Sequence, residues 1–371
     1  MVRLKDIALQ ASVSSATVSR ILNKDDSLAV TDETREKVLR IADELGYQPS
    51  AKRRKNRSRS DSAPLIGVVS CLSPEEERQD PYFSAIRKGI EEECFRQKIF
   101  ITSSIHLGSF QKHMFYELDG VIVIGSLQDE ALTNISAAFR HAVFVNGTPD
   151  PARYDSVSVD FYAAAQKAIE HLLSLGYQRL GYIGGREREH TVIDGVNSNK
   201  TIEDKRLTAF LQMAGAEPEH TVIDGVNSNK TIEDKRLTAF LQMAGAEPEH
   251  VLIGEYSMHE GFRLMNEAIK GGSLPDAFFI ASDSMAVGAL KALQEAGLQV
   301  PRDTAVVSFN GIDEAEYAST PLSTVKVYTE EMGRTGVKLL LDRLNGRTVP
   351  LAVTLPTSLI VRQSCGSQER R

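Results

Sequence analysis

The sequence predicts an N-terminal all-α helix-turn-helix headpiece followed by an α/β core of two doubly wound parallel-sheet lobes. Three observations predict this class. Residues 4–23 carry two short helical patterns around a tight turn. A basic run without acids follows at 52–59. From residue 65 onward, continuous apolar runs alternate with amphipathic helices in two successive sets, which is typical of parallel sheets covered on both faces.

The first two helices are predicted from apolar spacing and a cap. In the first helix one stripe at i, i+3, i+4 and i+7 is made by Leu4, Ile7, Ala8 and Ala11. Ser14 is a suitable N-cap for a second helix, Ser15–Leu22. The polar face of that helix carries small or hydrogen-bonding side chains that let it lie close against a groove: Ser15, Ala16, Thr17, Ser19 and Arg20.

A third helix begins after Thr31, a second N-cap, with Asp32 and Glu33 in its first turn, and Gly46 is expected to end it. A generic pair of cytosolic helices produces similar periodicities. Three helices within fifty residues nevertheless favour a small helix-turn-helix module that binds DNA.

Charge is distributed unevenly along the chain. The net charge is −7, but residues 1–60 hold 13 Lys/Arg and 8 Asp/Glu, so this part carries +5 and the remaining 311 residues carry −12. An acidic body with a basic arm favours contact with the phosphate backbone at that arm alone. The alternative is a solvated linker, and one segment can serve as both.

The core is read from its apolar runs. The first set of predicted strands covers residues 65–70, 99–103, 120–125 and 142–145. The second set covers residues 180–185, 251–256, 277–282 and 305–309. Two such sets predict two lobes with a ligand bound between them at the carboxyl ends of the strands. The run LGYIGG lacks the G-x-G-x-x-G pattern, so no dinucleotide site is expected.

The segment KDIALQASVSSATVSRILN, followed by GYQPSA, resembles the headpiece of the LacI/GalR family of sugar-responsive repressors. The resemblance covers nearly the whole chain and is closest to the galactose and β-galactoside branch. It implies a core like that of the periplasmic sugar-binding proteins, with three chain crossings between the lobes. The domains expected are a headpiece at 1–48, a basic hinge at 49–64 and an effector-binding and dimerisation core at 65–371. Lobe 1 is expected at about 65–158 and 328–355, and lobe 2 at about 159–327 and 356–365.

The resemblance also implies the DNA-binding residues. Base edges are expected to be read by Ser15, Ala16 and Arg20. Phosphate contacts are expected from Ser14, Thr17, Ser19 and Asn23. Two departures stand out: Ser12 occupies a turn position that is usually Gly, and no Leu wedge follows Tyr47-Gln48-Pro49. The hinge residues Lys52, Arg53, Arg54 and Lys55 therefore either grip the minor groove without kinking it or hold phosphates only.

Sugars are bound by carboxylates, amides and Arg, with an aromatic ring against the apolar face of the sugar. The resemblance places Arg206, or its repeat Arg236, as the ligand clamp and Tyr256 as the aromatic platform. Further residues expected at the effector site are Tyr82, Phe83, Asn146, Ser282, Asp283 and Asn310. For Asn146 and Ser282 the alternative is a polar strand terminus without a ligand.

Residues 191–220 recur without a single change as residues 221–250. Solenoid repeats need about three or more units, and old repeats drift, so this is either a very recent duplication or an error in the recorded sequence. We assign the repeat no function. A lobe has room for one copy of the helix TIEDKRLTAFLQMAG, and loop-closure entropy grows slowly enough for the other copy to be accommodated. The sequence does not say which copy is displaced.

The expected protein is a dimeric repressor that binds operator DNA and is released by a small sugar, galactose or a β-galactoside being favoured. No cofactor is expected: Cys71, Cys94 and Cys365 lack metal-ligand spacing, and neither a nucleophile-base pair nor a phosphate loop points to an enzyme. No leader or membrane span is expected, so the protein should be cytoplasmic and nucleoid-associated. A tetramerising heptad tail is not expected either. The alternatives are a corepressor-type regulator, tightened on DNA by its ligand, and a transport-type sugar-binding protein.

Overall fold

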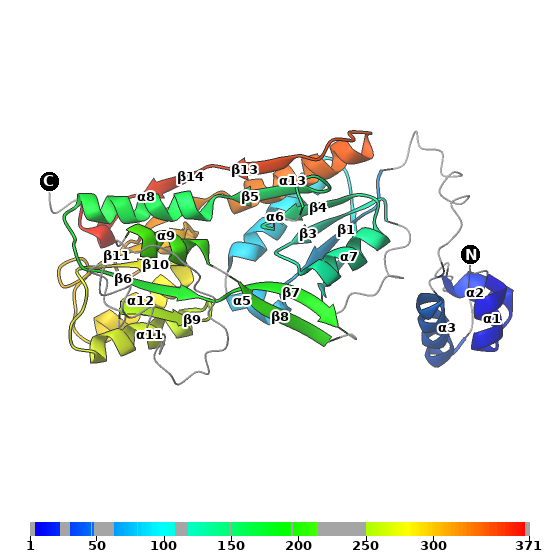
Figure 1. Ribbon diagram of the computed structural model, residues 1–371, viewed down its shortest axis with the longest axis horizontal. Coiled ribbons are helices and arrows are strands. Elements are labelled where there is room, and N and C mark those ends of the chain that lie inside the picture. The colour runs from blue at the N-terminus through cyan, green and yellow to red at the C-terminus, as the bar shows by residue number, and fades with distance from the viewer. Residues whose placement is uncertain are drawn as a thin grey trace.

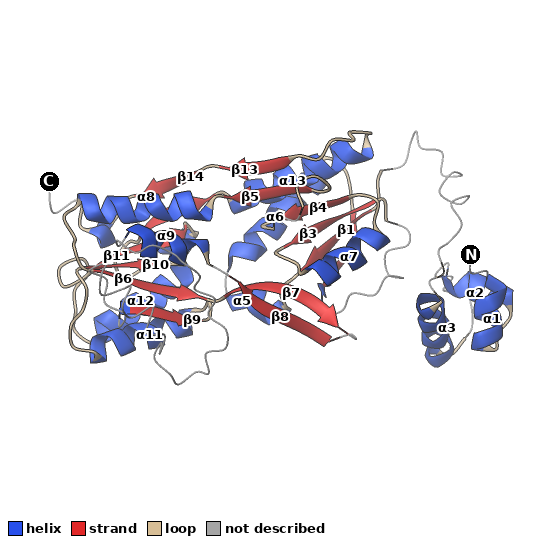
Figure 2. Ribbon diagram, in the orientation of Figure 1, coloured by secondary structure: helices blue, strands red, loops and turns tan. Residues whose placement is uncertain are grey.

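A computed structural model describes residues 4–22, 30–45, 47, 63–79, 81–107, 118–147, 150–193, 196–202, 204–213 and 250–367. It contains a three-helix headpiece and an elongated core of two sheets, each covered by helices (Figures 1 and 2). The predicted fold class is therefore confirmed. Within the described residues no helix has the length and apolarity needed to cross a membrane.

The headpiece consists of α1 (Leu4–Ala11), α2 (Ser15–Leu22) and α3 (Asp32–Glu44). The predicted apolar stripes meet in one small core that includes Ile7, Val18 and Val38, each fully buried. Both predicted caps form: the Thr17 amide donates to Ser14 Oγ at 3.0 Å, and the Thr34 amide donates to Thr31 Oγ1 at 3.3 Å.

Two details of the headpiece concern helix ends. Ser12, between α1 and α2, has a φ of 59°, the left-handed region in which glycine is less strained than serine. The helix α3 has its C-cap at Leu45, and the predicted terminator Gly46 lies outside the described residues.

Lobe 1 is built on a parallel six-stranded sheet with the order β13-β5-β4-β3-β1-β2. Its strands are β1 (Ile66–Ser70), β2 (Ile101–His106), β3 (Gly120–Ile124), β4 (Ala142–Val145), β5 (Asp155–Val159) and β13 (Ala352–Leu355). Its helices are α5 (Pro74–Gln79), α6 (Pro81–Arg96), α7 (Asp129–Ala138) and α13 (Thr329–Leu344). The second strand begins two residues later than the predicted run 99–103.

Lobe 2 is built on a second six-stranded sheet with the order β14-β12-β11-β10-β6-β9, in which β14 alone runs antiparallel. Its strands are β6 (Leu180–Gly185), β9 (Val251–Gly254), β10 (Ala277–Ile280), β11 (Ala305–Asn310), β12 (Ser323–Val327) and β14 (Thr357–Ile360). Its helices are α8 (Phe161–Ser174), α9 (Lys205–Met213), α11 (Met258–Lys270) and α12 (Asp283–Glu295), with 3-10 turns η4 (Asp313–Ala315) and η5 (Gln363–Cys365).

The central strands of both sheets are buried at every residue, which is why their sequences are continuously apolar rather than alternating. In each lobe the first strand pairs with both the second and the third, so the order reverses beside the first strand. Ligands bind at such switch points, outside the carboxyl ends of the strands. The chain passes between the lobes after β5, after β12 and between β13 and β14.

A two-stranded antiparallel hairpin, β7 (Glu187–Ile193) and β8 (Val196–Ile202), belongs to neither large sheet. It follows β6 after one residue, Arg186, and runs along lobe 1, where β7 contacts α7 (Figure 1). Sequence analysis did not predict it, although Asp194-Gly195 separates the two strands and Asp-Gly between strand-forming runs is a strong hairpin signal.

The repeated segment fills one place in the fold. Its first copy supplies most of the hairpin and the helix α9, whose Ala209 and Phe210 are fully buried against lobe 2. The second copy, including Arg236, lies outside the described residues, apart from its last residue, His250.

Candidate functional site

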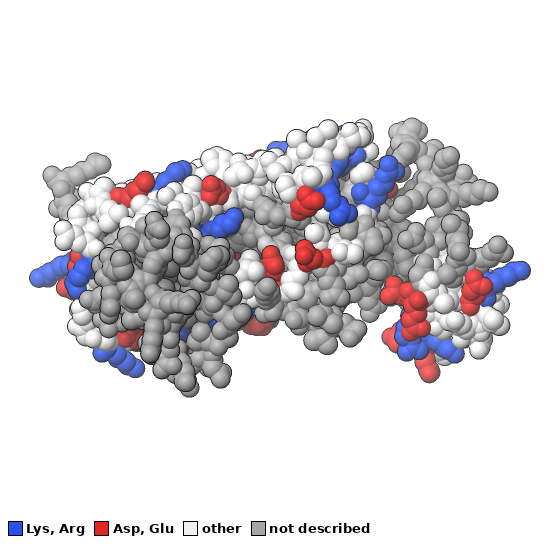
Figure 3. Space-filling model, in the orientation of Figure 1, with Lys and Arg blue, Asp and Glu red and all other residues white. Residues whose placement is uncertain are grey.

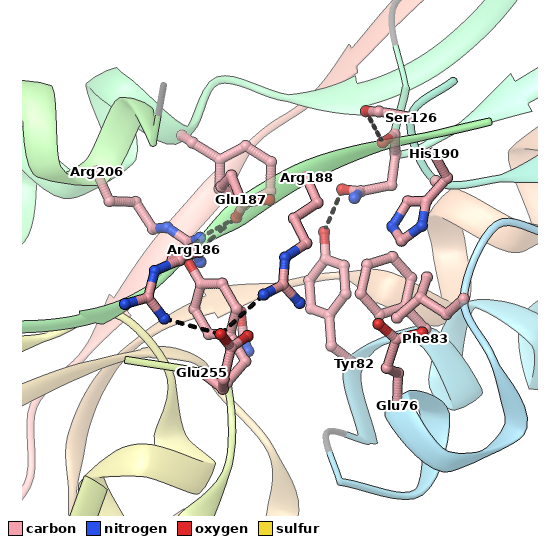
Figure 4. A pocket seen from close by; sticks show the side chains of 16 residues that line it. Glu76, Tyr82, Phe83, Ser126, Arg186, Glu187, Arg188, His190, Arg206 and Glu255 are labelled. Carbon is pink, nitrogen blue, oxygen red and sulfur yellow. Dashed lines mark hydrogen bonds and ion pairs between the residues drawn. The ribbon is translucent and has the colours of Figure 1, made fainter. Parts of the chain in front are cut away.

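The carboxyl ends of the strands in both lobes face one cleft, which holds about 880 Å³ of non-atom space with its open mouth included. Lobe 1 lines the cleft with Leu72, Glu76, Tyr82, Phe83, Gly125, Ser126 and Asn146. Lobe 2 and the hairpin line it with Phe161, Arg186, Glu187, Arg188, His190, Arg206, Glu255, Tyr256 and Asn310 (Figure 4).

Arg206 is the centre of the charged side of the cleft. It is the second residue of α9 and is 4% exposed. Its Nε donates to Asp204 Oδ1 at 2.9 Å and one terminal nitrogen donates to the Ala281 carbonyl at 3.0 Å. The other terminal nitrogen donates to Glu187 and to the Tyr256 hydroxyl. The guanidinium is therefore held in one orientation before any ligand arrives.

Aromatic rings enclose this guanidinium. Its carbon lies 4.9 Å from the ring centroid of Tyr256 and 5.3 Å from that of Phe161. Burial by itself lowers the pKa of Arg206, but the charges of Asp204 and Glu187 raise it well above its ordinary value. For Tyr256 burial acts in the opposite direction and raises the pKa, because it disfavours the charged phenolate. The Tyr256 hydroxyl therefore stays protonated and donates to Asp204 Oδ2 at 2.9 Å.

Lobe 1 offers a wall that is uncharged apart from Glu76. The Tyr82 hydroxyl donates to Asn146 Oδ1 at 2.8 Å, and the Tyr82 and Phe83 rings meet edge to face at 5.1 Å between centroids. Asn146 directly follows β4 and has a φ of 62°. Asn is one of the residue types that tolerate this left-handed backbone.

Two buried polar atoms at the cleft have no hydrogen-bond partner among the described residues: Asn310 Oδ1 and His190 Nδ1. Asn310 ends β11 with a φ of 107°, and His190 lies on β7. Buried polar groups are normally satisfied, so an unsatisfied acceptor that lines a cleft is available to a ligand hydroxyl.

Of the residues that the sequence placed at an effector site, six line the cleft: Tyr82, Phe83, Asn146, Arg206, Tyr256 and Asn310. Ser282 and Asp283 do not. Ser282 Oγ caps α12 by accepting from the Met285 amide at 3.2 Å. Asp283 Oδ1 accepts from Thr324 Oγ1 at 2.7 Å. Ser282 therefore caps α12, and Asp283 turns toward β11 and β12, so neither side chain enters the cleft.

Sequence analysis missed the charged wall that the hairpin supplies, namely Arg186, Glu187, Arg188 and His190, and it missed Glu255 and Glu76 as well. The Asp-Gly turn signal could have located the hairpin. No pattern in the sequence places the hairpin strands at the cleft, because their position depends on where β6 ends in the folded protein.

The headpiece presents the predicted DNA-reading side chains on α2. Ser14, Ala16 and Arg20 are exposed, while Ser15, Thr17 and Ser19 are half-buried. The helix α3 carries five acidic and three basic side chains, which lie together in Figure 3, whereas α2 has Arg20 as its single charged residue. DNA phosphates are therefore repelled less by α2 than by α3. Asn23 and the hinge residues Lys52, Arg53, Arg54 and Lys55 lie outside the described residues.

Comparison with known proteins agrees with both parts of the fold. Residues 3–50 match the family model of bacterial regulatory proteins of the lacI family, and residues 169–365 match a periplasmic binding protein-like domain. The chain is 67% identical to the HTH-type transcriptional repressor MelR of Bacillus subtilis (strain 168), with 99% of this chain and 98% of that protein covered. It is 33% identical to the HTH-type transcriptional regulator GalR of Streptococcus thermophilus, over 98% and 99% of the two chains.

Solved structures show the same architecture. A complex of the transcriptional regulator CelR with cellobiose superposes with a TM-score of 0.62 at 25% identity, covering 98% of this chain and 100% of that one. A lac repressor dimer bound to operator and the anti-inducer ONPF superposes with a TM-score of 0.60 at 24% identity, covering 98% and 99%.

Proposed function

The chain belongs to the LacI family of sugar-responsive DNA-binding repressors, and we propose that galactose or a galactoside is the effector that releases it from its operator. The observation that carries the choice of a neutral sugar is the charge balance of the cleft. Three arginines and three glutamates line it, and burial lowers the pKa of His190, so that side chain is neutral at pH 7.

A balanced lining of donors and acceptors suits an uncharged polyhydroxyl ligand better than a sugar phosphate or a nucleotide. Arg206, Asn146 and Asn310 supply hydrogen bonds to hydroxyls, and Tyr256, Phe83 and Phe161 supply apolar faces. In our proposal Arg206 and Tyr256 bind the galactosyl ring, with Asn310 Oδ1 accepting from one of its hydroxyls. Arg236, at the matching place in the repeat, is assigned the same role where its copy is seated.

The DNA-binding assignment follows from the headpiece. We assign base contacts to Ser15, Ala16 and Arg20, and phosphate contacts to Ser14, Thr17, Ser19 and Asn23. The hinge residues Lys52, Arg53, Arg54 and Lys55 are assigned to the minor groove or its phosphates. Two such headpieces in a two-fold dimer fit a pseudo-palindromic operator, and the place of action is then the nucleoid.

The proposed coupling runs through the angle between the lobes. A sugar that bridges the cleft changes this angle and moves the two headpieces out of register with their half-sites. Because the coupling is thermodynamic, operator and sugar must weaken each other's binding by the same factor.

The test is fluorescence anisotropy of the full chain on a duplex selected from a random pool, titrated with galactose, the α-linked disaccharide melibiose and the β-linked disaccharide lactose. Release by at least one of them is expected. DNA affinity that none of the sugars changes would contradict the proposal. An increase in DNA affinity on adding adenine or guanine would favour the corepressor alternative.

Replacing Arg20 by Ala tests the headpiece assignment. The loss of a base contact should weaken binding to the selected duplex by about 1–3 kcal/mol and leave sugar affinity unchanged. The measurement compares the selected duplex with a random one. Equal losses on both would mean that Arg20 contacts phosphate only.

A further inference from the structure

The inner face of the β7–β8 hairpin supplies side chains to the effector cleft that belong to neither lobe's sheet. Arg186, Arg188 and His190 stand at every second position along the chain and all three line the cleft. Arg188 and His190 lie at alternate positions of β7 and therefore share one face of the strand, and Arg186 directly precedes it.

This face is fixed at its base in lobe 2. The Arg186 amide donates to the Gly254 carbonyl at 3.1 Å. The Arg186 and Arg188 guanidinium groups both donate to Glu255 Oε1 at 2.8 Å. One carboxylate oxygen therefore holds both arginine side chains in place while other N–H groups of each remain available.

The hairpin is also fixed to lobe 1, beyond β3. The His190 amide donates to the Ser126 carbonyl at 3.1 Å, and the Gln128 amide donates back to the His190 carbonyl at 3.0 Å. Gln128 Nε2 also donates to the Glu189 carbonyl at 3.1 Å. Because these contacts use the backbone of His190, its imidazole is positioned without being consumed by them.

The cleft therefore has two separate places that lack polar partners. Asn310 Oδ1 ends a strand of lobe 2, whereas His190 Nδ1 lies where the hairpin meets lobe 1, and His190 is 6% exposed. Figure 4 shows Arg206 and His190 at opposite sides of the lining, with Arg188 between them and Glu76 on the side of His190. A ligand that is confined to the Arg206 side leaves the second place unsatisfied.

We propose that Arg188 and His190 form a second sugar subsite, which binds the residue attached to the galactosyl ring of a disaccharide effector. This inference rests on the proposed function, since it assumes that the galactosyl ring occupies the Arg206 side. Arg188 donates to hydroxyls of the second ring, His190 Nδ1 bonds to one of them, and the Glu76 carboxylate is a further acceptor. The hairpin thereby makes the protein selective for disaccharides over galactose.

Calorimetry on the full chain tests the subsite with galactose, melibiose and lactose. At least one disaccharide should bind about tenfold more tightly than galactose, the equivalent of one net hydrogen bond to a polar or charged group. His190→Ala and Arg188→Ala should each remove about that factor for the disaccharide. Galactose affinity should change by less than about twofold, because the Arg206 network is untouched.

Glu189→Ala is the matched control, since Glu189 lies between the two residues on the same strand and does not line the cleft. It should leave all three affinities unchanged. Equal affinities of the unaltered protein for galactose and both disaccharides would overturn the subsite. Equal losses for galactose and the disaccharide in His190→Ala would overturn it too, while leaving the proposed function intact. No binding of any of the three sugars would instead overturn the proposed function, and the subsite with it.

Discussion

The two lobes share one strand order but line the cleft with different chemistry. Lobe 1 contributes aromatic, amide and small side chains, and Glu76 is its single charged residue among those described at the cleft. Lobe 2 with its hairpin contributes five charged residues, Arg186, Glu187, Arg188, Arg206 and Glu255. The strand order therefore determines where the cleft lies, while the residues near the strand ends determine which ligand chemistry it can bind.

Lobe 1 does carry a buried charge, but at its outer edge. Asp155 on β5 is fully buried, and its carboxylate accepts from Arg343 Nε at 2.8 Å and from Arg347 at 2.9 Å. The Leu351 amide donates to it as well, at 2.6 Å. This cluster joins β5 to α13 and to the start of β13. In lobe 1 the buried ion pairs thus hold the fold together, whereas in lobe 2 they face the ligand.

The largest expected effect comes from the charged wall of lobe 2. Replacing Arg206 and Arg236 together by Ala leaves the buried Asp204 without its cation, so sugar affinity should fall by about a hundredfold, the equivalent of about 3 kcal/mol. Operator binding should persist. Calorimetry with the effector sugar and anisotropy with operator measure the two.

The control for this variant is Arg263→Ala, because Arg263 forms its ion pairs with Glu260 and Glu267 on α11 and does not line the cleft. It should leave sugar binding unchanged. Undiminished release of operator by sugar in the double variant would remove both arginines from the site.

The next effect tests whether the lobe 1 charge is structural. Asp155→Asn leaves Arg343 and Arg347 without their anion and should lower the free energy of unfolding by about 3 kcal/mol. Sugar affinity of the folded protein should not change. Urea unfolding at pH 7 and calorimetry check the two halves of this prediction, and a loss of affinity without a loss of stability would reverse our assignment.

The pH dependence of this difference has a definite sign. Burial raises the pKa of Asp155, but Arg347, the Leu351 amide and Arg343 outweigh burial and hold it below its ordinary value of 3.8. A lowered pKa stabilises the fold above 3.8, and this contribution is lost as the pH falls toward the pKa of the folded state. The difference in free energy of unfolding between the unaltered protein and Asp155→Asn should therefore become smaller in acid.

The smallest expected effect lies on the wall of lobe 1. Tyr82→Phe removes the hydroxyl that donates to Asn146, which should weaken sugar binding by about fivefold, or about 1 kcal/mol. Tyr317→Phe is the control, since Tyr317 is 83% exposed. A loss as large as that of the double arginine variant would show that both sides of the cleft contribute equally and would end the contrast.

Sequence patterns predicted the parts of the fold that burial dictates. Continuous apolar runs located the central strands of both sheets, and caps located α2 and α3. The elements that were missed are the strands β5, β12, β13 and β14, the helices α5, α7 and α13, and the hairpin. The strands β5 and β12 are mostly buried, but they read DSVSV and STVKV and so lack a continuous apolar run. The edge strands β13 and β14 have little apolar signature, because only part of their surface is buried.

Sequence analysis placed residues at the cleft where a side chain lies at the carboxyl end of a strand, as Asn146 does after β4 and Asn310 does at the end of β11. Ser282 and Asp283 also lie beyond the carboxyl end of a strand, but Ser282 caps α12 and Asp283 accepts from Ser308, Thr324 and the Ile312 amide. Arg188 and His190 could not be predicted because their place depends on tertiary contacts between His190, Ser126 and Gln128, which no local pattern encodes.

The place that α9 occupies beside α8 has a consequence for how this chain tolerates mutation. The helix α9 packs there through its side chains, and residues 235–243 have the same sequence as Lys205–Met213. A substitution confined to one copy leaves the same residues unaltered in the other, so the role proposed for Arg206 is tested fully only when Arg236 is replaced with it.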